Sequence, residues 1–307
     1  MSIPLLLAEK IAYLLVFMSL GFIMVKARIL KSDDSTALSK IIIYLITPAI
    51  VLEAYDVSMT PEIRTGLVIA FIASIAMHFI LLGIDFLYKK TLHPDNVSRS
   101  AAMYSNTGNI LIPIVLSLFG KEWVIYSSAY LSVQLCFVWT HSIGLFSGDS
   151  RPKVKKLATN PILISVVIGL VMAFTGIHLP SPVKQITGPL TDMVGPLSLF
   201  ACGMIATEVK LGKLIRDARF YIVLFIRMIF SPLVILLIAK PILPHITFPD
   251  ATKIILIPYL AAIAPVGASV VQFAQIYDKD PDFAVAVNIV STLMCIITMP
   301  LFVALFI

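Results

Sequence analysis

The chain has 307 residues, of which 59% are hydrophobic and only 13% are charged. A soluble domain carries roughly twice that charged share, so one water-exposed shell around one core is excluded, and the mean hydropathy of +0.99 indicates that most of the surface meets lipid. The net charge of +6 does not indicate a nucleic-acid surface, because the basic residues stand in short loops between apolar runs.

A membrane helix needs about 20 mostly apolar residues. Apolar segments of about this length follow one another along the chain. We expect ten of them, at 4–25, 38–55, 65–87, 99–119, 123–147, 160–179, 188–208, 218–240, 251–275 and 282–306. The predicted fold class is therefore an all-α membrane protein with ten transmembrane helices. The start MSIPLLLAEK lacks a basic stretch and a cleavage site, so no signal peptide is expected.

Lys and Arg residues concentrate in the loops that follow odd-numbered segments. This excess predicts that the odd loops are cytoplasmic and that both termini of a multi-pass cell (inner) membrane protein face outside. The longest basic stretch, RPKVKK at 151–156, divides the chain. We expect a first five-helix repeat at 1–148, a basic cytoplasmic linker at 149–159 and a second repeat at 160–307.

Halves with an odd number of spans insert with opposite orientation, which is the inverted-repeat plan of many secondary carriers. Prolines in matching segments agree with this plan. Pro48 in segment 2 matches Pro196 in segment 7, and Pro113 in segment 4 matches Pro265 in segment 9. Chance placement of prolines, which are common in membrane helices, is the alternative.

Segments 4 and 9 carry the residues that we expect to interrupt a helix. Polar amides and a glycine at mid-depth are costly in lipid, and Pro113 clashes with the carbonyl of Asn109, so segment 4 should break there. Matching breaks in the two halves indicate a transport site, although ordinary kinks are the alternative. The expected substrate-binding residues are Asn106, Thr107, Gly108, Asn109, Pro113, Gln134, Pro265, Val266, Gly267, Ala268 and Ser269, with Pro48, Pro196 and Ser198 as support for the breaks.

The breaks also indicate the charge of the substrate. A half-helix that starts after a break presents N–H groups and the positive end of its dipole, and two such starts favour an anion. Asparagine amides can donate hydrogen bonds to a carboxylate. The expected partners are thus a small organic anion and the lipid bilayer, with no nucleic acid and no cofactor, and a homodimer as the oligomer to test.

The motifs resemble those of the auxin efflux carrier family over essentially the whole chain. Asn106-Thr107-Gly108-Asn109 with Ile112-Pro113 is similar to its fourth-helix motif, and Leu45–Ala49 (LITPA) to its second helix. The seventh and ninth helices are matched by Pro196–Phe200 (PLSLF) with Cys202–Met204 (CGM), and by Ala264–Gly267 (APVG), Phe273–Tyr277 (FAQIY) and Pro281-Asp282.

This resemblance implies two inverted five-helix repeats with helices 4 and 9 crossing at the centre, within the bile/arsenite/riboflavin transporter superfamily. It also implies export or uptake of carboxylates such as indole-3-acetate, malate or malonate. The chain lacks the long cytoplasmic loop of many plant members, so it resembles the compact bacterial ones.

Ionisable residues within the segments could couple transport to an ion. Possible coupling residues are His78, His141 and Arg227, although a packed, neutral side chain is the more common state for each histidine. Glu53, Asp85 and Glu208 are expected at the membrane interface. Because neither crossing helix carries a mid-depth carboxylate, the sequence favours an anion carrier driven by the membrane potential, with proton symport as the rival.

Three other classes of protein compete with an anion carrier. A cation/proton antiporter shares the crossed-helix architecture but needs intramembrane carboxylates, which segments 4, 5, 9 and 10 lack at mid-depth. An enzyme is not expected, because the chain has no catalytic residues in a His-Glu-x-x-His, Gly-x-Ser-x-Gly or paired-aspartate pattern. A non-transporting sensor would need an output domain, for which the short loops leave no room. Cys136, Cys202 and Cys295 lack metal-ligand spacing, so no metal is expected.

Overall fold

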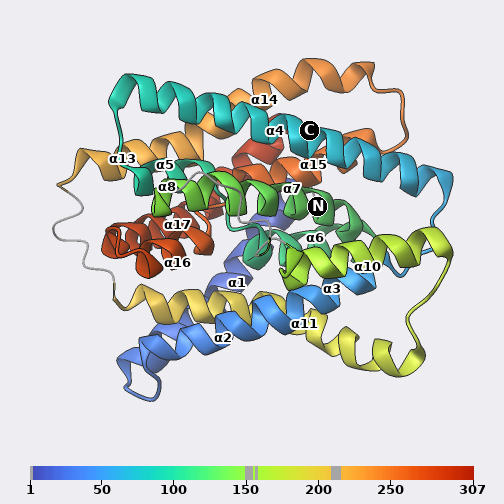
Figure 1. Cartoon of the computed structure of the whole chain (residues 1–307), viewed down its shortest axis with the longest axis horizontal. Helices are drawn as coiled ribbons and strands as arrows, with labels where there is room; N and C mark the ends of the chain where they lie inside the picture. The colour runs from blue at the N-terminus through green and yellow to red at the C-terminus, as the bar shows by residue number, and fades with distance from the viewer. Residues whose placement is uncertain (1–2, 149–154, 156–157, 209–215) are drawn as a thin grey trace.

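The structure, a computed structural model, describes residues 3–148, 155, 158–208 and 216–307 (Figure 1). Every expected segment coincides with a helical run. The unbroken helices are α1 (Ile3–Lys26), α4 (Pro61–Leu92), α10 (Pro161–Thr175), α11 (Ser181–Ala206) and α17 (Pro281–Phe306). The remaining runs are divided into α2 (Ser35–Ile41) and α3 (Thr47–Tyr55), α5 (Asn96–Met103) and α6 (Ile112–Phe119), α7 (Val124–Phe137) and α8 (Ile143–Ser147), α13 (Ala218–Phe225) and α14 (Ser231–Ile242), and α15 (Ala251–Ile263) and α16 (Ala268–Ile276).

Six helical runs within the described residues are long and apolar enough to cross a membrane. They are Ser32–Tyr55, Pro61–Leu92, Lys121–Ser147, Ser181–Ala206, Ala218–His245 and Pro281–Phe306, and shorter apolar helices lie at Val16–Lys26, Pro161–Thr175 and Ala251–Ile263. The molecule is thus a multi-pass, all-helical membrane protein. The basic linker expected at 149–159 lies largely outside the described residues.

Wide π-helical turns divide several of these runs, at Ile42–Ile46, Thr107–Leu111, Val138–Ser142 and Ile226–Phe230. Three of the turns stand just before a proline, namely Pro48, Pro113 or Pro232. A proline ring clashes with the carbonyl four residues earlier, and here that carbonyl lies inside the wide turn in each case. The extra width accommodates the ring, so the helix continues past the proline.

Two runs are interrupted by a stretch of extended backbone. α5 ends at Met103, and the chain is extended through Tyr104 before the π-helical turn begins at Thr107. α15 ends at Ile263, and the chain is extended from Ala264 to Gly267 before α16. The break in segment 4 thus precedes Gly108, earlier than Pro113 had indicated. Pro113 lies in the first turn of α6, where a missing N–H costs little.

The helices form two groups, and Figure 1 shows α2, α3 and α11 along one edge of the molecule and α4, α13 and α14 along the opposite edge. The first group consists of α1, α2, α3, α10 and α11, and the second of α4 to α8 with α13 to α17. Within the first group α1 packs on α11 and α10 packs on α3, so the first span of each half contacts the second span of the other half. The groups meet where α1 contacts α6 and α17, where α10 and α3 contact α7, and where α11 contacts the turn Thr107–Leu111.

Polar contacts gather the loops at the two ends of the molecule. Arg219 forms ion pairs with Asp95, Asp217 and Asp280, which belong to the loops after segments 3, 7 and 9. At the other end, contacts join the even loops and the helix ends beside them: Lys184 and His178 contact Asp56, Lys121 contacts Glu53, and Lys253 lies over the Trp123 ring. Odd loops and even loops are therefore each held together among themselves, as alternating crossings require.

Candidate functional site

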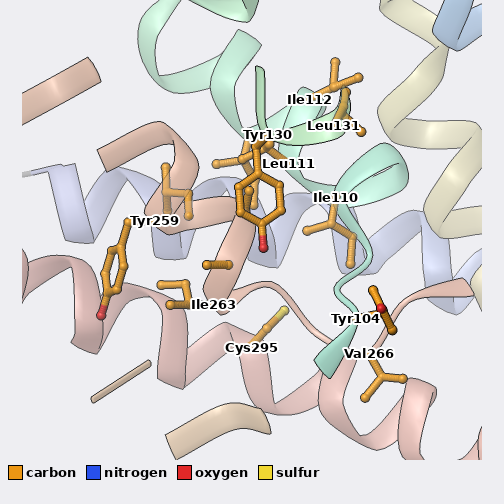
Figure 2. Packing of buried hydrophobic residues seen from close by; sticks show 14 of the residues in the cluster. Tyr104, Ile110, Leu111, Ile112, Tyr130, Leu131, Tyr259, Ile263, Val266 and Cys295 are labelled. Atoms are coloured by element: carbon orange, nitrogen blue, oxygen red, sulfur yellow. The ribbon is translucent and has the colours of Figure 1, made fainter. Parts of the chain in front are cut away.

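The two interrupted segments cross and pair with one another through their backbones. Ser105 and Val266 form an antiparallel bridge, the N–H of Asn106 donates to the carbonyl of Pro265 (2.8 Å), and the N–H of Gly267 donates to the carbonyl of Tyr104 (2.8 Å). Figure 2 shows Tyr104 and Val266 lying together in the buried core. A Cβ on Gly267 would lie 2.9 Å from the Ser105 carbonyl oxygen, so glycine permits this close approach.

The middle residue of each crossing segment is held by a carboxamide from the last span of its own half. The Ser105 hydroxyl donates to Gln134 Oε1 (2.6 Å), and Gln134 Nε2 donates to the Ser105 carbonyl (2.9 Å). In the second half Asn288 Nδ2 donates to the Val266 carbonyl (2.6 Å), and the N–H of Val266 donates to Ser291 Oγ (3.0 Å). These bonds satisfy backbone groups that a broken helix leaves open in lipid.

Arg227 lies where the two interrupted helices end, and its side chain is fully buried. Its guanidinium donates to the carbonyls of Met103 (3.0 Å), Ala262 (2.7 Å) and Ala264 (3.0 Å from Nε and 2.6 Å from Nη2). Carbonyls at a helix C-terminus lack partners within the helix and carry the negative end of its dipole. Arg227 thus compensates both C-terminal ends, and its partners are backbone oxygens.

The opposite side of the crossing presents the start of the next half-helix. Asn106 is 4% exposed, and its Nδ2 has no hydrogen-bond partner among the described residues. Thr107 Oγ1 contacts Ser105 Oγ at 3.1 Å, and a Cβ added to Gly108 would meet nothing within 4 Å. An unused buried donor therefore lies next to open space at a positive helix end. The structure describes Asn109 in the π-helical turn but not its side chain.

The other expected binding residues occupy different positions around the crossing. Pro265, Val266 and Gly267 are buried in it, whereas Ala268 and Ser269 are half-buried in the first turn of α16. The remaining residues take no direct part in it. Pro48 and Pro196 lie in α3 and α11 of the first helix group, where the buried Ser198 hydroxyl has no partner, and α11 packs against the turn that contains Thr107.

The two intramembrane histidines have different surroundings. His78 is 1% exposed, its Nδ1 lies 2.8 Å from the Ser74 carbonyl, and its ring stacks on Phe137. His141 is half-buried, with Nδ1 2.9 Å from the Tyr104 hydroxyl and Nε2 3.6 Å from Asp85.

Asp85 is buried inside the protein and paired there. Its carboxylate is 6% exposed and accepts two hydrogen bonds from Arg99, at 2.9 Å from Nε and 2.5 Å from Nη2. This partner comes from α5, fourteen residues away along the chain. Glu53 is likewise partly buried and accepts from Thr187 and Thr191, whereas Glu208 is exposed.

Two apolar cavities lie among the described residues, away from the crossing. One, of 360 Å³, lies between α4 and α14, and the other, of 460 Å³, between α4 and α13. Both are lined almost entirely by aliphatic and aromatic side chains, which suits lipid and not a carboxylate. We therefore place the site on the polar chemistry of the crossing.

Several residues of the crossing were not singled out by the sequence. Ser105 precedes the Asn-Thr-Gly-Asn motif, and Asn288 and Ser291 lie in segment 10, which reads as an ordinary span. The available signal was Asn288 itself, a carboxamide in an apolar run that matches Gln134 in segment 5 of the first half.

Comparison with known proteins agrees with this description. A family model described as "Membrane transport protein", an auxin efflux carrier-like family, matches residues 6–156 and 150–303. A search of curated protein sequences gives no significant match.

Proposed function

Because the chain belongs to the membrane transport protein family, we propose that it is a secondary transporter of small organic anions. The substrates are mono- or dicarboxylates such as malate, malonate or auxin-like acids, moved by alternating access across a bacterial inner membrane. The observation that carries the proposal is the buried, unpartnered Nδ2 of Asn106 at the start of a half-helix.

The charge distribution of the crossing supports an anion. Arg227 compensates the two C-terminal ends, whereas the N–H groups at the start of the turn Thr107–Leu111 and of α16 keep their positive character. A carboxylate offers the acceptor that Asn106 lacks. A cation at the same place would face an amide donor and positive helix ends.

A cation/proton antiporter is supported less well. Such a carrier needs a carboxylate that is free to exchange its charge partner. Asp85 is buried and connected to the crossing through His141 and Tyr104, but it already accepts two hydrogen bonds from Arg99.

Matching features of the two halves support an inverted repeat of 1–148 and 160–307. Each half has an interrupted fourth span whose middle residue is held by a carboxamide of the fifth span, Gln134 in one half and Asn288 in the other. The reciprocal packing of α1 on α11 and of α10 on α3 has the same symmetry. Two helix groups that meet at the site provide the parts that alternating access moves against each other.

Transport by purified protein in liposomes tests the proposal. The wild type should exchange radiolabelled malate, malonate or indole-3-acetate at equal pH and zero potential. Asn106→Ala removes one donor to a buried charged group, so the apparent affinity should fall about 10- to 150-fold. Asn106→Asp should be at least as damaging, because it places a negative charge beside the anion.

Ser231→Ala is the matched control, since it removes a buried hydroxyl that also lacks a partner but lies in α14. It should leave the apparent affinity unchanged. Exchange by Asn106→Ala with wild-type affinity would remove the crossing from the binding mechanism.

A further inference from the structure

A chain of titratable side chains connects the crossing to α4. Tyr104, whose carbonyl bonds Gly267 across the crossing, places its hydroxyl 2.9 Å from His141 Nδ1 and 3.1 Å from the carbonyl of Phe137. His141 Nε2 lies 3.6 Å from Asp85 Oδ2, and Asp85 is paired with Arg99. The four side chains come from α4, α5, the crossing segment and the π-helical turn Val138–Ser142.

We propose that His141 is a proton-binding site through which this chain couples carboxylate transport to proton movement. The inference rests on the proposed function, because it assigns the coupling ion of the same carrier. It differs from the potential-driven carrier that the sequence favoured, because the carboxylate that sequence reasoning found missing from the crossing helices is supplied by Asp85 of α4.

The geometry around His141 accepts both protonation states. In the neutral state with the hydrogen on Nε2, the ring faces the Asp85 carboxylate, and the Tyr104 hydroxyl donates to Nδ1. When a proton binds Nδ1, that nitrogen becomes a donor to the Tyr104 oxygen. The Tyr104 hydrogen then turns to the Phe137 carbonyl, which already lies 3.1 Å away. No partner has to move to complete either arrangement.

Protonation changes the balance of charge around Asp85. When His141 is neutral, Arg99 is the cation that neutralises the Asp85 carboxylate. When His141 is protonated, the carboxylate lies next to two cations, Arg99 and His141. Tyr88 of α4 is the other titratable group close to Asp85, and Asp95 and Arg219 lie farther along toward the loop. These groups surround His141 with one carboxylate that stabilises its cation and one guanidinium that opposes it.

Tyr104 connects the protonation state of His141 to the crossing. Its side chain changes from donor to acceptor toward His141, while its backbone is fixed to Gly267 and precedes Ser105 and Asn106. A small shift of this residue therefore reaches the site residues directly along the chain.

His78 lacks these properties. Its Nδ1 faces the Ser74 carbonyl and must carry the hydrogen, and in the part of the chain that the structure describes its Nε2 has no acceptor for a second one. The ring is enclosed by Tyr130 and Phe137, and the charge near it is the cation of Arg227. The geometry thus assigns proton binding to one of the two intramembrane histidines that the sequence proposed.

Accumulation driven by a pH gradient in liposomes tests the assignment. The probe is whichever of radiolabelled malate or malonate the wild type exchanges, with the potential held at zero by potassium and valinomycin. With acidic outside medium, the wild type should accumulate the probe up to about tenfold per pH unit for each proton carried. The readout is accumulation divided by exchange in the same vesicles, which corrects for the amount of active protein.

His141→Gln should reduce this ratio to that of vesicles without a pH gradient, and Tyr104→Phe, which keeps the imidazole but removes its reporter hydroxyl, should reduce it severalfold. His178→Gln, at an exposed histidine, is the control and should keep the wild-type ratio. If His141→Gln yields no active protein, the ratio measured for Tyr104→Phe tests the assignment of His141 in its place.

The outcomes distinguish a failure of proton coupling through His141 from a failure of the proposed carboxylate transport. A wild type that exchanges no carboxylate contradicts the proposed function. A wild type that exchanges but does not accumulate contradicts only the coupling. Loss of the ratio in His78→Gln together with its retention in His141→Gln or Tyr104→Phe would overturn the assignment of His141.

Discussion

At the scale of single residues, Arg227 shows how a buried charge can stabilise a broken membrane helix. Its guanidinium satisfies the carbonyls of Met103, Ala262 and Ala264, and leaving one such buried group unpaired costs about 1–3 kcal/mol. We therefore expect Arg227→Met to lower the thermal unfolding temperature strongly in detergent. The unfolding temperature of Arg227→Lys should lie between those of the wild type and Arg227→Met, because an ammonium group keeps the charge but loses the planar arrangement of donors.

Arg64→Met is the control for this pair, since Arg64 is exposed and contacts only the Phe174 ring in the contacts described. If the unfolding temperature of Arg227→Met shifted no more than that of Arg64→Met, the carbonyl contacts would not stabilise the crossing.

Sequence reasoning at this scale could find residues whose chemistry conflicts with lipid, but not their partners. Asn106 and Arg227 stand out because an amide or a cation is costly within an apolar run. Asn288 was missed and the partner of Asp85 was not identified, because a single amide in an apolar run and a carboxylate near the end of a span both have ordinary local explanations. Only the fold brings Asn288 to Val266 and Arg99 to Asp85.

At the scale of elements, the apolar runs predicted the long helical runs among the described residues, since the length of a span is set by the membrane. The position of the break in segment 4 was not predictable from Pro113, because a proline is accommodated either by a break or by a wide turn. Which of the two occurs depends on the backbone partner across the crossing, and Pro265 supplies that partner for Asn106.

The contact of α1 with α11 depends on glycines that let the two backbones meet. A Cβ on Gly203 would overlap the Met18 carbonyl oxygen, and one on Gly21 would overlap the Phe200 carbonyl oxygen. Gly203→Ala should therefore destabilise the protein by about 1–3 kcal/mol through overpacking. Gly83→Ala in α4, where a Cβ meets nothing within 4 Å, should be neutral or slightly stabilising.

Thermal unfolding in detergent measures both changes, and the difference between the two alanine variants is the informative quantity. Equal unfolding temperatures would show that the backbones of α1 and α11 have room for a methyl group.

At the scale of the whole molecule, polar contacts join loops of the same parity, which is the arrangement that alternating crossings would require. Arg219 joins the loops after segments 3, 7 and 9, and Lys184 joins the loops after segments 2 and 6. If a span failed to cross the membrane, the loops after it would change sides, and one of these contacts would have to pass through the membrane. The excess of Lys and Arg then selects the cytoplasmic end.

The expected sidedness is tested with a membrane-impermeant maleimide on intact cells. The background should carry Cys136→Ser, because Cys136 is exposed, whereas Cys202 and Cys295 are buried. Cysteine at Ser181, an exposed residue after segment 6, should be labelled from outside. Cysteine at the exposed Lys279, after segment 9, should be labelled only once the membrane is permeabilised, because positively charged loops resist translocation. Labelling of both positions from the same side would contradict alternating crossings between segments 6 and 9 and, with them, halves of opposite orientation.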